Sequence, residues 1–328
     1  FRFGIFVLII WYLLDNFIKF KLLFFYSLLI TLSIVILSSI VDFFLFYDQF
    51  KVTRLSGLFG EEKVQGSYLL RITPILILTY FYNKQFLNKG IHFIFYSILF
   101  IAFILIILSG ERSTIFLMFV GIFLTYIFFR VKIKRLFFYS LLSSLLVAII
   151  FILNPSIKER VVDKTLHSFF YSHDVNYKYK RELNLFSQGH QDHFTSALVM
   201  FKKNYLIGVG VRNFRNECKK DLYKEVGIYR CSSHPHNTYL QILSETGLIG
   251  FSFFIIFLSF VSASAFKYLL NIYKNREAIN INSSLCFVII LVNFFPLTTT
   301  GSFFNNWLST LYFMPIPFLL HELNYKKY

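Results

Sequence analysis

The chain alternates long apolar runs with short polar segments. Runs that can supply the roughly 20 residues needed to cross a bilayer predict eight spans, at about residues 22–46, 67–83, 91–108, 114–129, 136–153, 247–266, 281–297 and 303–320. A further apolar run, Phe3–Leu14, has the pattern of a truncated ninth span. Backbone amides in lipid must be paired within their own segment, and the runs are too long for barrel strands. The pattern therefore predicts an all-α, polytopic membrane protein with eight or nine transmembrane helices.

Composition favours the same class of protein. Hydrophobic residues make up 56% of the chain and charged residues 15%, and the mean hydropathy is +0.60, which excludes a water-soluble fold. In a soluble protein, the net charge of +16 would suggest a nucleic-acid partner. Here Lys and Arg lie mainly between the apolar runs, so we expect the lipid bilayer as a partner and no nucleic acid. Phe1 lies inside an apolar stretch without an initiator Met, so we expect the chain to lack its amino end.

The distribution of Lys and Arg between the predicted spans indicates their orientation. One alternate set of connecting segments holds 13 Lys or Arg, and its members are residues 15–21, 84–90, 130–135, 267–277 and 322–328. The opposite set, residues 47–66, 109–113 and 298–303, holds four. Because basic residues near span ends stay in the cytoplasm, the first set is predicted to be cytoplasmic. We therefore expect three parts: N-terminal transmembrane helices at 1–153, a periplasmic loop unit at 154–236, and C-terminal transmembrane helices at 237–328.

Three charged residues lie inside the predicted spans or directly before one: Asp42 and Arg71 lie within spans, and Glu245 directly precedes the span at 247–266. Charges within a membrane are costly and mark function by default. All three lie near the outer ends of their spans, where side chains that reach the interface, or that pair with each other, explain them equally well. Asp42 and Arg71 are expected at similar depth on consecutive spans, so a simple ion pair is one interpretation.

The most concentrated polar pattern is SSHPHNTYLQILSETGLIG, residues 232–250, which leads directly into a predicted span. Asn237, Gln241 and Glu245 recur at every fourth residue, the spacing of one helix face. The pattern predicts a helix start at which His236 and a polar stripe point together into the protein. An interfacial histidine that caps a helix has the same spacing, so both interpretations stay open on spacing alone.

Five segments together carry a resemblance to a known family. They are RLSGLFG at 54–60, GSYL at 66–69, SGERS at 109–113, LIGVGVRNF at 206–214 and HNTYLQILSETGLIG at 236–250. In this order, over about residues 50–320, they resemble the O-antigen ligase and polymerase superfamily. The resemblance implies many helices in the bacterial inner membrane and a large periplasmic loop. It also implies transfer of a glycan from a polyprenyl (undecaprenyl) diphosphate carrier to an acceptor hydroxyl, with no cofactor and no metal.

The resemblance further implies roles for single residues. His236 matches the histidine that assists the acceptor, and Arg112 is the first candidate for holding the diphosphate, followed by Arg54 and Arg212. Arginine suits a diphosphate because its planar fork grips phosphate oxygens bidentately. Neutral histidine suits the acceptor because it takes a proton or hydrogen bond from a hydroxyl. The remaining residues expected beside the substrate are Asn237 and Glu245.

Each arginine also has a structural interpretation. Arg112 and Glu111 would cap a tight outer turn between two spans. Arg54 lies in a glycine-containing loop, where a flexible re-entrant turn explains the glycines as well as close approach to a diphosphate does. For Arg212, an ordinary solvated basic face is at least as good an interpretation.

Two histidine pairs, His190 with His193 and His234 with His236, have spacings that can also serve a zinc ion, with Asp192 as a further ligand. The loop unit offers no clustered carboxylates of the kind that a divalent-metal enzyme needs. A metal site is therefore the lesser expectation, and we predict none.

Two further features are predicted in the loop unit. Cys218 and Cys231 bracket a short basic hairpin and are expected to close a disulfide in an oxidising periplasm, worth roughly 3 kcal/mol in the chain-entropy model. The stretch 192–206 predicts an interfacial amphipathic helix. Its apolar face is expected to contain Phe194, Leu198 and Phe201.

Three functions follow from these features. The leading interpretation is an O-antigen ligase, which attaches the glycan to lipid A core in lipopolysaccharide biosynthesis, and a polysaccharide polymerase that extends a growing glycan is close behind. Single displacement of the diphosphate predicts a metal-independent, inverting glycosyltransferase. A transporter of lipid-linked sugars is the interpretation from another class, although transporters usually show paired halves and the polar material here is lopsided. We expect Arg54, Arg112 and His236 to share a cavity at the outer leaflet.

Overall fold

The computed structural model describes residues 2–50, 55–166 and 186–325. These residues form helices and connecting loops, and no strand occurs among them. Contacts divide the chain into two units, each made of separate stretches: unit 1 comprises residues 1–161, 277–293 and 310–328, and unit 2 comprises residues 162–276 and 294–309. The expected three-part division follows membrane topology rather than contacts, and it stays a prediction.

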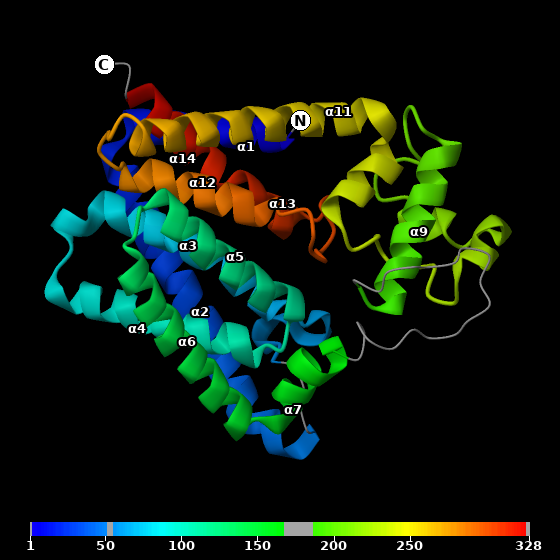
Figure 1. Cartoon of the computed structure of the whole chain (residues 1–328), viewed down its shortest axis with the longest axis horizontal. Helices are drawn as coiled ribbons and strands as arrows, with labels where there is room; N and C mark the ends of the chain where they lie inside the picture. Colours follow the sequence, from blue (N-terminus) through cyan, green and yellow to red (C-terminus); the bar gives the residue numbers. More distant parts are fainter. Residues whose placement is uncertain (1, 51–54, 167–185, 326–328) are drawn as a thin grey trace. The chain divides into compact units, whose positions relative to one another are not determined.

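Unit 1 is a bundle of apolar helices (Figure 1). Its elements are α1 (Arg2–Asn16), α2 (Ile18–Phe50), η1 (Gly57–Glu62), α3 (Gln65–Asn83), η2 (Lys84–Phe86), α4 (Lys89–Leu108), α5 (Arg112–Phe128), α6 (Ile133–Leu153), α7 (Pro155–Lys158), α12 (Ile281–Asn293) and α14 (Pro315–Tyr325). The most enclosed of them is α12, which packs against α3, α5 and α14 and buries most of its side chains. A helix that is apolar on nearly all sides is stable only when it is surrounded. α12 is therefore the core helix of unit 1.

Unit 2 contains one long helix and several short elements. They are α9 (Gln188–Lys203), α10 (Phe214–Glu217), η4 (Asp221–Val226), α11 (Thr238–Tyr273) and an irregular segment, residues 294–305, here called the 294–305 loop. The chain passes between the units four times: within η3 (Glu159–Asp163), after Arg276, after Asn293 and within α13 (Asn306–Phe313). A small apolar core holds unit 2 together, formed by Ala197, Met200, Phe214, Cys218, Tyr223 and Val226.

Four helices in the described ranges are long and apolar enough to cross a membrane. They are Ile18–Leu45, Lys89–Leu108, Ile133–Leu153 and Thr238–Tyr273. Large apolar side chains on them are exposed, including Phe44, Phe93, Ile152 and Phe253. Such surface is unfavourable in water and suits hydrocarbon. These helices indicate a multi-pass membrane protein, and the expected total of eight or nine spans stays a prediction.

Two predicted spans do not continue as single helices. The span expected at 281–297 ends as helix at Asn293, and the one expected at 303–320 is divided into α13 and α14 around Met314. Pro315 explains the division, because proline lacks the backbone N–H and disfavours the helical conformation of the residue before it. The polar run between α12 and α13 explains why residues 294–305 leave the helix.

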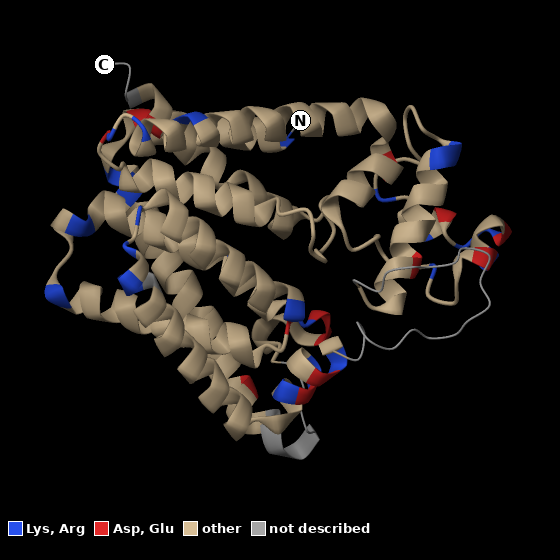
Figure 2. Cartoon of the chain, in the orientation of Figure 1, with Lys and Arg blue, Asp and Glu red and all other residues tan. Residues whose placement is uncertain are grey.

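Lys and Arg gather at one end of the long helices of unit 1, where α3 leads to α4 and α5 leads to α6 (Figure 2). This group includes Lys84, Lys89, Arg130 and Lys132. The opposite end of α5 begins with the adjacent pair Glu111 and Arg112, so acid and base are mixed there. The charge asymmetry that predicts the orientation is thus a property of the folded unit, while the side of the membrane on which each end lies stays a prediction.

Asp42 and Arg71 do not form the ion pair that is one interpretation of the sequence. Asp42 Oδ2 instead accepts hydrogen bonds from the backbone N–H groups of Ser56 and the next residue, at 3.0 and 2.9 Å, which fastens α2 to the start of η1. Arg71 Nη1 donates to the carbonyl and hydroxyl oxygens of Ser67, at 3.0 and 2.5 Å. The guanidinium carbon of Arg71 also lies 5.5 Å from the centre of the Tyr312 ring. Each charge therefore has local partners.

Candidate functional site

His236 lies in unit 2 directly before α11. Asn237 caps that helix, because its side-chain oxygen accepts a hydrogen bond from the backbone N–H of Leu240 at 3.1 Å. The backbone of His236 has φ of 59°, in the left-handed region that is unfavourable for residues other than glycine. Its carbonyl accepts a hydrogen bond from the N–H of Thr300 at 2.9 Å. Strained backbone that the surrounding structure holds in place is typical of functional residues.

Four histidine rings gather at this point. Measured between ring centroids, His236 lies 4.1 Å from His234, 5.2 Å from His193 and 5.3 Å from His190. His190 and His193 both come from α9, so the cluster joins α9 to the start of α11. Burial, together with the neighbouring histidines, lowers the pKa of His236 to about 2. Burial also lowers the pKa of His234 to about 4, and both rings are therefore neutral at pH 7.

Two of the candidate metal ligands have protein partners. His234 Nε2 lies 3.2 Å from the carbonyl of Thr300, and its Nδ1 lies 2.8 Å from the hydroxyl of Ser233. The carboxylate of Asp192 accepts a hydrogen bond from the backbone N–H of Tyr229 at 3.1 Å. Across the described ranges, no group of three or more His, Cys, Asp or Glu side chains is arranged to hold a metal ion.

The polar stripe on α11 binds the backbone of the 294–305 loop. Asn237 Nδ2 donates to the carbonyl of Pro296 at 3.0 Å. Gln241 accepts a hydrogen bond from the N–H of Phe303 at 2.8 Å and donates to the hydroxyl of Ser302 at 2.9 Å. The loop that supports the His236 carbonyl is thus fastened to the first turns of α11.

Glu245, the third residue of the stripe, holds a different segment. Its carboxylate accepts hydrogen bonds from the backbone N–H groups of Arg212 and Phe214, at 2.8 and 3.2 Å. Gln241 Nε2 lies 3.4 Å from the same carboxylate. The side chain is buried, and hydrogen bonds of this kind offset the cost of removing a carboxylate from water. The role expected for Glu245 beside the substrate stays a prediction, and its observed contacts position Arg212.

Two glycines bring the 206–214 segment onto α11. The helix is kinked at Gly247, where φ is 64°. A Cβ atom on Gly247 would lie 2.3 Å from the carbonyl carbon of Leu206, and one on Gly208 would lie 2.4 Å from that of Glu245. Backbone groups from the two segments pair across this contact. Because only glycine permits so close an approach, LIGVG and the SETG of α11 are two halves of one contact.

Arg212 follows this contact directly. Its backbone is left-handed, with φ of 61°. Its Nε donates to the carbonyl of Phe304 at 3.1 Å, and its Nη2 donates to the same oxygen. The 294–305 loop therefore anchors two candidate site residues, His236 through Thr300 and Arg212 through Phe304. The side chain of Arg212 is exposed, as the solvated interpretation expects, but it is fixed at its guanidinium.

Cys218 and Cys231 are joined by a disulfide bond, with their Cα atoms 5.3 Å apart. Cys218 belongs to the small core of unit 2, and Cys231 packs against it. The hydroxyl of Ser196 on α9 donates to the carbonyl of Arg230 at 3.0 Å, which holds the neighbouring backbone. The disulfide and this hydrogen bond therefore hold the start of the segment that leads from Cys231 to His236.

The helix expected in the stretch 192–206 is α9, and the interfacial position of its apolar face stays a prediction. Leu198 is 42% exposed. The residues that α9 buries are Asp192, Ser196, Ala197 and Met200. The reason is that Asp192 and Ser196 bind the backbone around residues 229–230, so polar contacts rather than the apolar stripe orient the helix.

Arg112 begins α5 in unit 1. The carboxylate of Glu111 accepts hydrogen bonds from the N–H of Gly66 at 2.8 Å and from the hydroxyl of Thr114 at 3.1 Å. A Cβ atom on Gly66 would lie 2.2 Å from the Ser109 hydroxyl, so a side chain there would force this contact apart. GSYL and SGERS thus meet where α3 and α5 begin. The carboxylate of Glu111 stabilises the turn before α5, as the structural interpretation expects. Arg112 is half-buried and follows it directly.

The expected convergence of Arg54, Arg112 and His236 stays a prediction. Arg54 belongs to residues 51–54, which lie outside the described residues. Arg112 lies in unit 1, and His236 and Arg212 lie in unit 2. The structure brings together His236, the other three histidines and the loop that holds Arg212.

The 294–305 loop, which provides partners for His236, Asn237, Gln241 and Arg212, was not predicted from the sequence. A signal was present, since LTTTGSFFNN at 297–306 interrupts the apolar pattern with small and polar residues. The apolar pattern divides those residues between a short connection and the ends of two predicted spans. The role of Gln241 was likewise missed, although its place in the stripe is evident from the spacing.

Comparison with known families covers the middle of the chain. Residues 97–255 match the sequence model of the O-antigen ligase family. The matched range includes Arg112, α9 with its two histidines, the LIGVG segment and the polar stripe of α11. No curated protein matches the chain. This match confirms the resemblance to the O-antigen ligase and polymerase superfamily.

Proposed function

We propose that this protein moves a glycan from a polyprenyl (undecaprenyl) diphosphate carrier to an acceptor hydroxyl at the outer face of the bacterial inner membrane. The observation that carries the proposal is the cluster around His236, where a neutral imidazole on left-handed backbone lies among three other histidines. The family supports a lipid-linked glycan as the substrate. The scheme uses no metal and no cofactor.

His236 acts on the acceptor in this proposal. The acceptor oxygen bonds to the anomeric carbon, the bond from that carbon to the diphosphate oxygen breaks, and the acceptor proton passes to the imidazole. With its pKa lowered to about 2, His236 is a weak base, so it first orients the hydroxyl by accepting its hydrogen bond. As the bond breaks, charge that develops on the diphosphate favours the protonated ring. One displacement from the face opposite the leaving group inverts the anomeric centre.

Arginines bind the diphosphate in this proposal. Arg212 is supported by its fixed guanidinium: two N–H groups are held by one carbonyl, and an arginine carries five donors in all. Arg112 is supported by its place at the start of α5, where the helix dipole also favours an anion. Arg54, which precedes η1 in the sequence, is proposed as a further contact. A diphosphate leaves readily, so neutralising its developing charge is the main requirement.

Asn237 and Glu245 act as positioning residues in this scheme. Asn237 fastens the loop whose Thr300 holds the backbone of His236. Glu245 holds the backbone of Arg212. Misplacement of a reacting group by about 1 Å can cost about 10²-fold in rate, so both residues matter without touching the substrate.

The acceptor is proposed to be lipid A core, which makes the protein an O-antigen ligase. The polymerase alternative uses the same donor and chemistry and adds the glycan to a growing chain. Purified protein incubated with carrier-linked glycan and lipid A core distinguishes them. Glycan attached to core supports the ligase, and a lengthened carrier-linked product with unmodified core overturns that assignment.

The test of the chemistry is His236→Ala. We expect transfer to fall by about 10²- to 10⁴-fold, the usual contribution of general acid–base catalysis. His92→Ala is the matched control, because His92 lies on α4 in unit 1 with its Nδ1 3.0 Å from the Tyr80 hydroxyl. Transfer near the original rate in His236→Ala, with equal protein folded in the membrane, contradicts the proposal.

The transporter alternative predicts a different outcome for the same variant. A transporter of lipid-linked sugars would lose translocation of the carrier across vesicles while any glycan transfer stayed intact. The polar material of the chain is concentrated around one long segment without a matching half, which favours the enzyme.

A further inference from the structure

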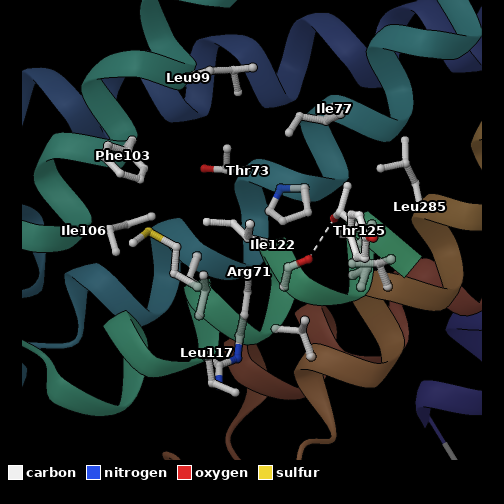
Figure 3. Close-up of a pocket in the computed structure, with 18 of the residues that line it drawn as sticks. Arg71, Thr73, Ile77, Leu99, Phe103, Ile106, Leu117, Ile122, Thr125 and Leu285 are labelled. Atoms are coloured by element: carbon white, nitrogen blue, oxygen red, sulfur yellow. Dashed lines mark hydrogen bonds between the residues drawn. The ribbon is translucent and has the colours of Figure 1, made fainter. Parts of the chain in front are cut away.

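Unit 1 contains a cavity of about 560 Å³ between α3, α4, α5 and α12 (Figure 3). Its wall is mostly apolar, with Leu99 and Phe103 from α4 and Leu285 from α12. On α3 the lining runs from Leu70 to Phe81, about 16 Å at 1.5 Å per residue. The cavity is therefore long, and it follows the helix axis as a hydrocarbon chain in a bilayer does.

Arg71 is the charged residue in this wall, and Figure 3 shows its nitrogen atoms toward Leu117. Its side chain is only 2% exposed, and its Nε has no hydrogen-bond partner. Among the described residues, no carboxylate lies within salt-bridge distance of its guanidinium. Thr73, which also lines the cavity, has a buried hydroxyl without a partner. A buried charge without a counter-charge is costly, so the site is suited to an anion.

The cavity also reaches the surface of unit 1. Two lining residues are substantially exposed, Ile122 at 38% and Tyr139 at 60%. Tyr139 belongs to α6, which buries little of its surface against the rest of unit 1. A chain that enters here can continue into lipid, so the volume needs to hold only part of a long chain. That volume lies in the roughly 300–1,000 Å³ range of ligand sites.

The charged residue of the cavity lies near the candidate diphosphate residue of the same unit. Gly66, on α3, contacts Glu111, which directly precedes Arg112. Arg71 is five residues further along α3, about 7.5 Å, and its Nη1 donates back to Ser67. Arg71 and Arg112 therefore lie toward the same end of unit 1, with the apolar cavity extending away from it.

We propose that this cavity binds the phosphate-proximal part of the carrier's isoprenoid chain, with Arg71 holding an oxygen of its diphosphate. This inference rests on the proposed function and adds a binding site to it. One narrow cavity with one cation fits a single-chain lipid with a compact anionic head. A phospholipid with two acyl chains fits this shape less well.

Binding of purified polyisoprenyl diphosphate to the delipidated protein, measured by native mass spectrometry, tests the site. Leu99→Trp fills the cavity and is expected to weaken binding about tenfold or more. Phe100→Trp is its matched control, because Phe100 is 58% exposed and does not line the cavity. Arg71→Gln is expected to weaken binding about tenfold, as the loss of one charge-assisted hydrogen bond does, and Arg71→Lys to restore part of it.

Two comparisons separate the possible outcomes. Polyisoprenol without phosphate should bind weakly to the original protein and be insensitive to Arg71→Gln, and phosphatidylglycerol should compete poorly. Equal binding by Leu99→Trp and Phe100→Trp, or equal occupancy by phosphatidylglycerol, overturns the inference. His236→Ala should bind the carrier normally without transferring glycan. If it transfers glycan, the proposed function fails while the binding result stands.

Discussion

At the scale of single residues, backbone atoms hold the candidate site in place. The carbonyl of His236 accepts a hydrogen bond from the N–H of Thr300, and the guanidinium of Arg212 donates to the carbonyl of Phe304. The carboxylate of Glu245 accepts hydrogen bonds from two backbone N–H groups. Residue type predicted His236 as a candidate, because an imidazole can accept a proton near neutral pH. It did not predict that Glu245 would support Arg212 from 33 residues away, because a carboxylate accepts a hydrogen bond from any N–H that the fold brings to it.

Acidification should destabilise the fold through His234 and His236, whose pKa values desolvation lowers in the folded state. The unfolded chain protonates histidine at a pKa of about 6.5, whereas folded His234 and His236 stay neutral down to about 4 and 2. As pH falls below about 6.5, the unfolded state binds protons that the folded state does not. Stability then falls by up to about 1.4 kcal/mol per pH unit for each histidine, and above this pH the loss is absent. The melting temperature of detergent-purified protein should fall between pH 6.5 and 5.

His236→Gln provides the comparison for that measurement, because glutamine does not titrate. Relative to its own value at pH 7.5, the variant should lose less stability on acidification than the original protein. Identical slopes would show that His236 is not buried as a neutral ring.

At the scale of elements, the contact between the 206–214 segment and α11 explains why two glycine-containing segments far apart in the sequence belong together. The kink at Gly247 opens the helix, and Gly208 fills the opening with backbone. Helix starts in both units follow local rules: Asn237 caps α11, and Asn88 caps α4 by accepting a hydrogen bond from Ile91 at 2.9 Å. The kink does not follow local rules, because its cause is the partner segment.

Gly208→Ala is expected to destabilise the protein by at least about 2 kcal/mol, because alanine is strained in left-handed backbone and its Cβ would meet backbone of α11. Melting temperature in detergent measures the effect. Gly189→Ala is the control within unit 2, since a Cβ there meets nothing closer than 3.8 Å and alanine favours the α9 helix. Equal melting temperatures for the two variants would mean that the close contact does not form.

At the scale of the whole molecule, the chain combines a bundle centred on α12 with a second unit that carries the histidine cluster. Each unit is assembled from separate stretches, so order in the sequence is a poor guide to what packs with what. The proposed chemistry also requires His236 to lie on the outer side of the membrane. Charge bias predicts that orientation, and it belongs to the whole chain rather than to one helix.

Cysteine labelling in intact cells checks the orientation. Ser233→Cys places an exposed thiol three residues before His236 and should react with a membrane-impermeant maleimide from outside. Lys132→Cys, between α5 and α6, should react only after the cells are lysed. The native cysteines are a small background, because Cys286 is buried and the other two form the disulfide. Labelling of Ser233→Cys only after lysis would remove the basis of the proposed mechanism.

The sequence by itself determined the class of protein, the approximate positions of its helices and its resemblance to a family. These depend on local properties: hydrogen bonds within a helix are made over four residues, apolar runs reflect contact with lipid, and family segments are short. Only the tertiary structure decided that α12 lies at the core of unit 1, that Asp42 and Arg71 do not pair, and that the 294–305 loop holds both His236 and Arg212. The identity of a polar residue does not predict its hydrogen-bond partner, because any backbone group with suitable geometry can serve. Only the folded structure determines which backbone group lies close enough.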